Sequence, residues 1–403
     1  MIRKILVNGL LVLISFAVTC LTAEFFLRRF ANGGTPADDP FLGKVMTPGG
    51  DWDANGFRNP VALPQSDIVA IGDSMTMGWN VASLDSWPQV LGKKTSTTAY
   101  SMALAGYGPV QYAYLTDQAL RLKPEIVIYG FFFGNDIRES EYFTYKNDAW
   151  KELRAAHYVS DGRDFTISMK AVQRAADAGV RPGEFLARVQ EIREWLWENS
   201  RLYSRTAKAT RTLRKKMGMA QASEEREKNI TTFAKAHAEQ AYAYDQTPGQ
   251  RTLLSPSYRL VAVDLENPAT KEGWRITQDR LLAIKEKLDR AAVPFVLVFL
   301  PTKEKIYLKY MARLNQRAPE SFSNYEGKEE RAIGTVADFC RKNHIRYTNV
   351  EAPMVEALVR GERLFDESLD GHPQVAGYRV IADHVAKYLS DSQLLPGSGT
   401  PKP

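Results

Sequence analysis

The chain contains a short apolar run that leads into Ile71-Gly72-Asp73-Ser74-Met75-Thr76-Met77-Gly78. The run 67–71 has the length of a buried strand, and the glycines after it favour a tight turn into a helix. A serine at the carboxyl end of a parallel strand lies where α/β sheets bind ligands. The helix that follows would offer backbone N–H groups to an oxyanion. Taken alone, this segment predicts either a nucleophilic serine or a helix cap, because serine and aspartate both cap helices well.

Short apolar runs alternate with helical patterns along the chain, which is typical of a parallel α/β sheet. The gap between the third and fourth apolar runs is far longer than the roughly thirty residues of a βαβ unit, so an insertion is predicted there. We expect strands at 67–71, 98–103, 125–133, 294–300 and 345–350. We expect helices at 86–94, 110–122, 275–291, 328–342 and 375–389.

The N-terminal residues 5–23 form an uncharged apolar run that is preceded by Arg3 and Lys4. As a helix this run would span roughly 28 Å, close to the ~30 Å hydrocarbon core of a bilayer. A cleaved signal peptide is the alternative, although Leu21 stands where the cleavage site prefers a small residue. We expect a transmembrane anchor within residues 1–30, with the rest of the chain outside the cytoplasm, in the periplasm.

Composition indicates the other boundaries. Residues 31–64 are rich in Gly, Pro and Asp and are expected to form an extended linker. The α/β domain is predicted to comprise residues 65–140 and 273–391. Residues 141–272 are the predicted insertion, which we expect to be largely helical and to act as a lid or to bind substrate. The tail 392–403 is expected to be disordered.

The charge and cysteine content exclude several classes of protein. A net charge of +6 is mildly basic, which fits contact with an anionic membrane surface or an acidic polymer. Because the chain has no nucleic-acid-binding motif, we expect no nucleic-acid partner. The two cysteines, Cys20 and Cys340, have no metal-ligand spacing, and we expect neither a metal nor a cofactor. A buried thiol is the favoured interpretation of Cys340, and a catalytic thiol is the alternative.

Three later segments of the chain contain further polar groups that could take part in the same site as Ser74. The second apolar run leads into Ala105-Gly106-Tyr107-Gly108, and the third into Gly134-Asn135-Asp136. Just before the last predicted helix stands Asp370-Gly371-His372-Pro373. A serine, a glycine N–H, an asparagine amide and a histidine are the groups that acyl transfer requires. We expect the strand ends to bring these groups together.

The order of these blocks resembles that of the SGNH (GDSL) hydrolase family, over about residues 60–140 and 275–390. The resemblance implies a three-layer α/β/α sandwich of the flavodoxin-like type, with five parallel strands in the order 2-1-3-4-5. It implies Ser74 as nucleophile and His372 as general base. It also implies an oxyanion hole made by the N–H groups of Ser74 and Gly106 and the side-chain amide of Asn135.

The orienting acid departs from the usual family pattern. The family has an aspartate three residues before the histidine, whereas this chain has Leu369 there. Asp370 is therefore the expected orienting acid, with Asp366 in reserve, and a simple turn residue is the alternative for Asp370. The remaining histidines are expected to be surface or packing residues: His157, His237, His344 and His384.

Two further segments are similar to segments of membrane-anchored relatives. Asn55-Gly56-Phe57-Arg58 precedes the first strand, as in anchored SGNH proteins. Pro301-Thr302-Lys303 follows the fourth strand and resembles the Pro-x-Lys of alginate-type O-acetyltransferases. The second segment makes Lys303 a candidate substrate-binding residue, with an ordinary surface lysine as the alternative.

The resemblance implies a serine esterase or O-acyltransferase that forms an acyl-enzyme on Ser74. The expected substrate is an ester, acetylated carbohydrate above all, in envelope or exported polysaccharide. A transferase outside the cytoplasm would need a membrane partner that carries the acyl donor. The alternatives are a lipase-like or lysophospholipase-like hydrolase and a non-catalytic, anchored polysaccharide-binding or assembly protein.

Overall fold

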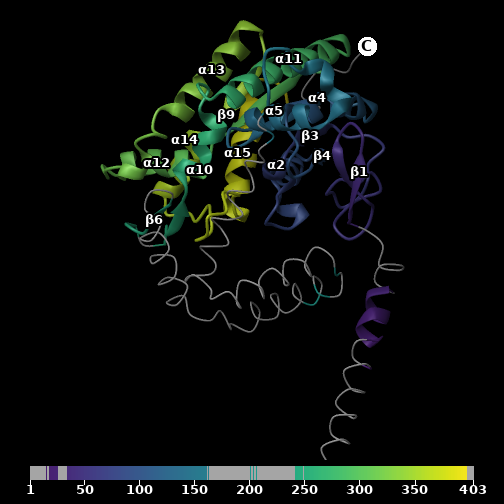
Figure 1. Cartoon of the computed structure of the whole chain (residues 1–403), viewed down its shortest axis with the longest axis horizontal. Helices are drawn as coiled ribbons and strands as arrows, with labels where there is room; N and C mark the ends of the chain where they lie inside the picture. Colours follow the sequence, from purple (N-terminus) through teal and green to yellow (C-terminus); the bar gives the residue numbers. More distant parts are fainter. Residues whose placement is uncertain are drawn as a thin grey trace, which may run out of the picture.

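A sheet of five parallel strands forms the centre of the molecule (Figure 1). The computed structural model describes residues 15, 18–25, 34–160, 162, 200, 203, 206, 241–247 and 249–396. The sheet order is β4-β3-β5-β8-β9, which confirms the expected order 2-1-3-4-5. Every strand begins and ends within about one residue of its predicted run. The strands are β3 Ile68–Gly72, β4 Ala99–Ala103, β5 Ile126–Phe132, β8 Phe295–Leu300 and β9 Arg346–Asn349.

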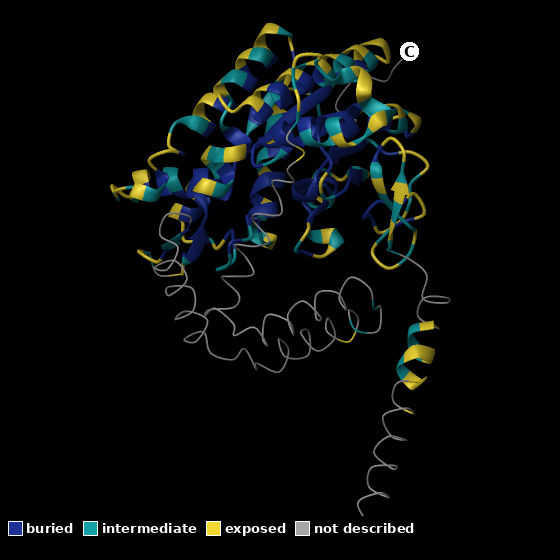
Figure 2. Cartoon of the chain, viewed as in Figure 1, coloured by how far each residue is buried: buried dark blue, intermediate teal, exposed yellow. Residues whose placement is uncertain are grey.

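The inner strands consist of buried residues because helices cover both faces of the sheet. Every residue of β3, β5 and β8 is buried, as expected for a parallel sheet between two helical layers. Strand β9 lies at the edge and is only partly buried. Figure 2 shows the buried residues in the interior and the exposed residues on the outer sides of the helices.

Two groups of helices form the outer layers. Helix α11 (Pro268–Arg290) packs against α4 (Pro109–Arg121) and α5 (Asp136–Lys146). Helix α15 (Val375–Asp391) packs against α3 (Trp87–Thr95) and α14 (Glu351–Val359) in the other group. Three further helices of eight or more residues belong to the described part of the domain, and α13 contacts β9. They are α10 Pro256–Val263, α12 Lys303–Arg313 and α13 Lys328–Lys342. The arrangement is the three-layer α/β/α architecture that the sequence predicts.

Several elements differ from the prediction. Helix α11 begins at Pro268 rather than near residue 275, because the Asn267 side chain accepts the N–H groups of Ala269 and Thr270 and caps the helix there. Helices α5, α10, α12 and α14 were not predicted. Helix α12 starts with three buried charged residues, so its first turn lacks the apolar stripe that marks a buried helix.

The expected extended linker contains a hairpin instead. Strands β1 (Pro36–Asp39) and β2 (Gly43–Met46) pair in antiparallel fashion. Between them, the Asp39 carboxylate accepts the N–H groups of Phe41 and Leu42 at 2.9 and 2.7 Å. Gly43 adopts a φ of 74°, which favours glycine. The Gly, Pro and Asp residues of this segment therefore form a turn between two strands, where the prediction had an open connection.

The predicted boundary of the insertion at residue 140 falls inside α5, which continues to Lys146 and packs against α11. A second hairpin, β6 (Tyr242–Tyr244) with β7 (Thr252–Leu254), lies within the predicted insertion. Most of residues 161–240, including His237, lies outside the described residues, as does the tail from residue 397.

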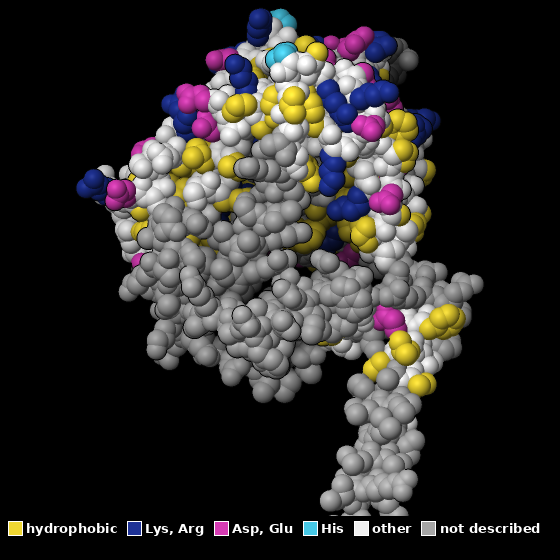
Figure 3. Space-filling view, in the orientation of Figure 1, with side chains coloured by type: hydrophobic (Ala, Val, Ile, Leu, Met, Phe, Trp, Pro, Cys, Tyr) yellow, Lys and Arg dark blue, Asp and Glu magenta, His cyan; other side chains and the backbone are white. Residues whose placement is uncertain are grey.

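None of the helices in the described part of the chain is long and apolar enough to cross a membrane. Most of the predicted anchor, including residues 1–14 and 26–30, lies outside the described residues. On the face drawn in Figure 3, the described Lys and Arg side chains are interspersed with Asp and Glu.

Candidate active site

Ser74, His372 and Asp370 form one chain of hydrogen bonds. Ser74 Oγ lies 2.8 Å from His372 Nε2, and His372 Nδ1 lies 2.5 Å from Asp370 Oδ1. With the proton on Nδ1, the imidazole donates to Asp370, and Nε2 is free to accept the proton of the Ser74 hydroxyl. Ser74 is only 9% exposed, so this hydroxyl lies in a largely desolvated position. The arrangement can activate an alcohol for attack on an ester.

The Gly-Asp-Ser segment divides its functions between neighbouring side chains. Asp73 Oδ1 accepts the N–H of Met75 at 2.8 Å and so caps helix α2 (Ser74–Met77). Because Asp73 is the cap, the Ser74 hydroxyl is left to contact His372. Helix α2 ends at Gly78, whose φ of 76° lies in the left-handed region.

Two glycines allow α2 to fold back over the strand ends. A Cβ added at Gly72 on β3, or at Gly130 on β5, would overlap the side-chain oxygen of Thr76. Residues with side chains at either place would push α2, and with it Ser74, away from the sheet. The tight approach explains why the nucleophile turn needs a glycine before Asp73.

Asp370, and not Asp366, contacts the imidazole. Asp370 Oδ1 also accepts the main-chain N–H of His372 at 3.0 Å. Asp366 instead accepts the N–H and the hydroxyl of Ser368, at 2.9 and 2.6 Å. These bonds fix the turn that precedes Asp370. Burial raises the pKa of Asp370, but the hydrogen bonds and charge of His372 and the charge of Lys303 outweigh burial and hold this pKa at about 2. Asp370 is therefore an anion at neutral pH.

The two expected oxyanion groups outside α2 border the same region. The Asn135 amide donates one N–H to Asp73 Oδ2 at 3.1 Å, and an amide nitrogen carries a second N–H. Its oxygen, Oδ1, is buried and has no hydrogen-bond partner among the described residues. Gly106 adopts a φ of 82°, and a Cβ placed there would meet no atom of the described residues within 4 Å.

Two buried carboxyls beneath the site were not predicted. Burial raises the pKa of Asp73, and it raises the pKa of Asp136 well above its usual range, where the charge of Asp73 adds to the effect. Tyr112 donates its hydroxyl to Asp136 at 3.1 Å, and the N–H of Phe132 donates to it at 3.0 Å. Asp136 thus fixes the end of β5, from which Asn135 projects. Asp73 precedes Ser74 and Asp136 follows Asn135 in the sequence. This position next to predicted site residues is the sequence feature that could have identified both aspartates.

Lys303 is neither a surface lysine nor a residue in contact with open space. Its side chain is 0% exposed, and its Nζ donates to the carbonyls of Ser368 and Asp370, each at 2.8 Å, and to Thr252 Oγ1 at 3.2 Å. Burial lowers the pKa of Lys303, while the nearby carboxylates of Glu304, Asp366 and Asp370 oppose this effect. The expectation of a substrate-binding lysine is therefore corrected: Lys303 holds the segment that carries Asp370 and His372.

A buried ion pair supports the same segment. Arg259 Nε lies 3.2 Å from Glu304 Oε2, and both side chains are almost fully buried. A Cβ at Gly371 would overlap the guanidinium of Arg259, so only glycine lets this arginine approach. Arg259 lies in the predicted insertion, and no pattern in the sequence marks it.

The other candidate residues lie in packed positions. His384 on α15 contacts Thr348 Oγ1 through Nε2 at 2.7 Å. Cys340 is fully buried, and burial raises the pKa of its thiol to about 12, which leaves it un-ionised at neutral pH. Among the described residues, no group of three or more His, Cys, Asp or Glu side chains could hold a metal ion.

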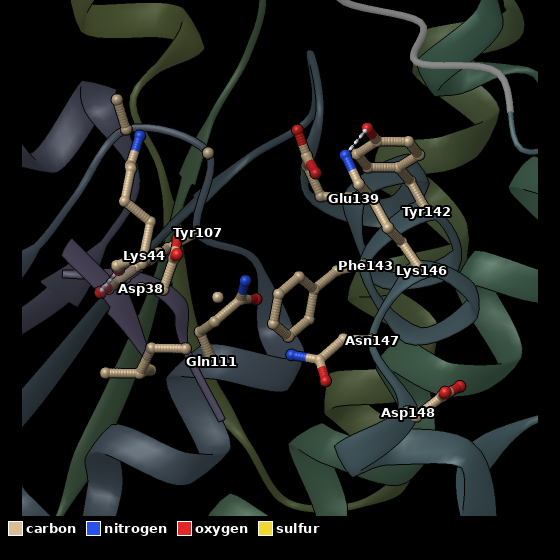
Figure 4. A pocket seen from close by; sticks show the side chains of 14 residues that line it. Asp38, Lys44, Tyr107, Gln111, Glu139, Tyr142, Phe143, Lys146, Asn147 and Asp148 are labelled. Carbon is tan, nitrogen blue, oxygen red and sulfur yellow. Dashed lines mark hydrogen bonds between the residues drawn. The ribbon is translucent and has the colours of Figure 1, made fainter. Parts of the chain in front are cut away.

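A cleft of about 690 Å³ opens beside Gly106 (Figure 4). Its walls are the β1–β2 hairpin, the loop after β4, and α5, which begins directly after Asn135. Lys146 donates to the hydroxyl of Tyr142 at 2.8 Å on one wall. Aromatic, charged and amide side chains line the cleft together: Asp38, Lys44, Tyr107, Gln111, Glu139, Tyr142, Phe143, Lys146, Asn147 and Asp148.

Comparison with known proteins finds similar chains among the solved structures. No protein-family model and no curated protein matches the chain. The chain is similar to a candidate lipolytic protein of the G-D-S-L family from Desulfitobacterium hafniense, at 13% identity and a TM-score of 0.32, over 79% of this chain and 97% of that one. It is also similar to a candidate acylhydrolase from Bacteroides fragilis, at 11% identity and a TM-score of 0.33, over 82% and 91%.

Proposed function

We propose that this chain is an SGNH-type serine esterase or O-acyltransferase that acts on ester-linked acetyl groups of envelope or exported polysaccharide. The observation that carries this proposal is the Ser74–His372–Asp370 chain of hydrogen bonds at the carboxyl end of the sheet. The strand order supports the family, because it is the order that the SGNH resemblance implies.

In the first step Ser74 Oγ attacks the ester carbonyl while His372 Nε2 takes the hydroxyl proton. The negative charge that develops on the carbonyl oxygen is stabilised by the free N–H of the Asn135 amide and by the main-chain N–H groups of Ser74 and Gly106. The bond to the sugar oxygen then breaks, and His372 returns its proton to the leaving alkoxide. Asp370 stays ionised and stabilises the imidazolium.

In the second step an acceptor hydroxyl attacks the acetyl group on Ser74. His372 removes the acceptor's proton, and Ser74 leaves with a proton from the same imidazole. Water as acceptor gives acetate and an esterase. A sugar hydroxyl as acceptor gives a new ester and a transferase. For a transferase, the ester attacked in the first step would be an acyl donor that a membrane partner delivers, and the donor's own leaving group would depart with the proton from His372.

The cleft beside Gly106 favours a carbohydrate over a lipid. Lipid chains are bound by continuous apolar walls, whereas this cleft is lined by carboxylates, lysines and amides between aromatic rings. The exposed carboxylates of Asp38 and Asp148 can accept hydrogen bonds from sugar hydroxyls, and the half-buried rings of Tyr142 and Phe143 offer apolar surface.

We propose that the enzyme is tethered to a membrane by residues 5–23 and works outside the cytoplasm. The support for this location is the length of the uncharged run and the basic residues before it. Proteolysis of intact spheroplasts tests the location: added protease should remove the catalytic domain without lysis. Protection of the domain until lysis would place it in the cytoplasm.

The activity is tested with the full chain purified in detergent. The substrates are an acetylated oligosaccharide, with and without a deacetylated acceptor, and a lysophospholipid. We expect acetate release or acetyl transfer on the sugar, and a loss of at least about 10³-fold in Ser74→Ala, with Ser83→Ala as the matched control. Preference for the lysophospholipid would favour a lipase. Binding of the polysaccharide without turnover, unchanged in Ser74→Ala, would favour a binding protein.

A further inference from the structure

One large aromatic side chain stands exposed beside the hydrogen-bonded site. Trp79 is 56% exposed, and its indole centroid lies 6.3 Å from the centroid of the His372 imidazole. The two ring planes are inclined by 31°. Isolated exposed apolar residues are common on proteins, so exposure alone says little. The position of this indole next to the imidazole that contacts Ser74 gives its exposure a functional meaning.

The backbone at Trp79 is held against the nucleophile turn. The N–H groups of Gly78 and Trp79 both donate to the carbonyl of Ser74, at 3.1 and 3.2 Å. Gly78 adopts the left-handed conformation that ends α2, and the chain leaves the helix there. Trp79 follows directly and is exposed to solvent. The indole is therefore attached to the same turn as the nucleophile, at a fixed position.

Arg58 holds this turn in place through two hydrogen bonds to its carbonyl groups. The Arg58 side chain is buried and donates to the carbonyl of Gly78 and, at 2.7 Å, to that of Val81. These bonds give the Asn55-Gly56-Phe57-Arg58 segment a structural role that the catalytic groups do not explain. Gly56, with a φ of 79°, passes so close to Met46 that a Cβ there would overlap the Met46 carbonyl oxygen.

The same turn also touches the histidine segment. Asn80 Nδ2 donates to the carbonyl of His372 at 3.3 Å. Within the described part of the chain, the buried Asn80 Oδ1 has no hydrogen-bond partner. Residues 78–81 thus contact the nucleophile turn at one end and the histidine segment at the other. An indole on this turn lies beside the imidazole that contacts Ser74.

We infer that Trp79 is a stacking platform for the sugar ring that carries the ester. This inference rests on the proposed esterase or transferase function. One face of a pyranose ring presents C–H groups, which are attracted to the electron-rich face of an indole. A single flat ring suits such a partner, whereas a flexible acyl chain is bound by several apolar side chains around it.

The test compares Trp79→Ala and Trp79→Phe with Leu84→Ala, which removes a neighbouring apolar side chain that is 64% exposed. Each full-length variant is assayed on an acetylated oligosaccharide, on 4-nitrophenyl acetate and on 4-nitrophenyl palmitate. For Trp79→Ala we expect kcat/KM on the oligosaccharide to fall about tenfold, mainly through KM, and at least fivefold more than on 4-nitrophenyl acetate. Trp79→Phe should recover most of this loss, and Leu84→Ala should match the wild type on all three esters.

The outcomes separate this inference from the proposed function. An equal loss on the sugar ester and on 4-nitrophenyl acetate would mean that Trp79 acts on His372 geometry, and it would overturn the platform. A larger loss on the palmitate ester would assign Trp79 to an acyl chain instead. If the wild type hydrolysed none of the esters, the proposed function would fail. Binding of a sugar to Trp79 could then still be measured by the fluorescence of the indole. Quenching by the deacetylated oligosaccharide in the wild type, and no such quenching in Trp79→Phe, would support the stacking platform, and equal quenching in both would overturn it.

Discussion

Lys303 Nζ donates a 2.8 Å hydrogen bond to the main-chain carbonyl of Asp370, the residue whose carboxylate contacts the His372 imidazole. A fully buried ammonium on α12 thereby supports the segment that carries the acid and the base. Two further bonds, to the Ser368 carbonyl and to Thr252 Oγ1, complete the three donor positions of the lysine. The alignment of the imidazole thus depends on a lysine of α12, whereas Ser74 begins α2.

Replacing Lys303 by methionine should lower kcat and destabilise the fold together. The change leaves two buried carbonyls without a donor, which we expect to cost roughly 1–3 kcal/mol each at most. Lys305→Met is the matched control, because Lys305 is a buried lysine on the same helix that pairs with Glu330 and Glu351, away from His372. Urea unfolding and steady-state kinetics measure both effects. Equal loss of kcat in both variants would show that Lys303 acts through general stability alone.

Asp370→Asn should reduce kcat by about 10⁴-fold, since an amide would no longer fix the tautomer of His372 or stabilise the imidazolium. Asp366→Asn is the control, because Asp366 contacts Ser368 and not the imidazole. We expect its kcat to stay within about tenfold of the wild type. If the larger loss appeared in Asp366→Asn, the acid would be assigned to the wrong aspartate.

The depressed pKa of Asp370 makes a pH-dependent contribution to stability. The folded-state pKa of about 2 lies below the ordinary value of 3.8, so the contribution is present above pH 3.8 and is lost as pH falls through 2. The shift corresponds to about 2 kcal/mol. The difference in unfolding free energy between the wild type and Asp370→Asn should shrink as the pH falls from 4 to 2. A difference that stayed unchanged between pH 4 and 2 would contradict the ionised carboxylate.

Asn135→Ala should lower kcat by about 10² to 10³-fold with little change in KM, because the amide is needed only when charge develops on the substrate oxygen. The amide also donates to Asp73, so unfolding free energy is measured alongside to detect any disturbance of α2. A large change in KM with kcat preserved would mean that Asn135 binds the ground state of the substrate instead.

The inner strands β3, β5 and β8 were predictable because each is a short buried run with turn residues after it. Residues 295–300, for example, are all buried and hydrophobic, and the sequence marks them plainly. Ser74 could be proposed because its block stands at a strand end, and Asp370 and His372 because their block precedes the last helix, in the order that the SGNH resemblance implies. The distance of 2.8 Å between Ser74 Oγ and His372 Nε2 joins residues that only the folded sheet brings together.

The supports of the site were not predictable, because each depends on partners far away in the chain. Lys303, Glu304 and Lys305 look like an exposed charged turn, yet all three are buried. Their partners include Asp370, Arg259 and Glu330, which no local pattern connects to α12. The β1–β2 hairpin was missed for a different reason: its Gly, Pro and Asp residues favour turns and linkers equally.

The measurement that tests the central claim most directly is labelling of the full chain with a fluorophosphonate probe, followed by mapping of the modified peptide by mass spectrometry. An activated serine reacts with such a probe, whereas an ordinary serine hydroxyl does not. We predict a single label on Ser74, lost in Ser74→Ala and in His372→Ala and retained in Ser83→Ala. A folded protein that stays unlabelled, or is labelled on another serine, would contradict the assignment of Ser74 as the nucleophile.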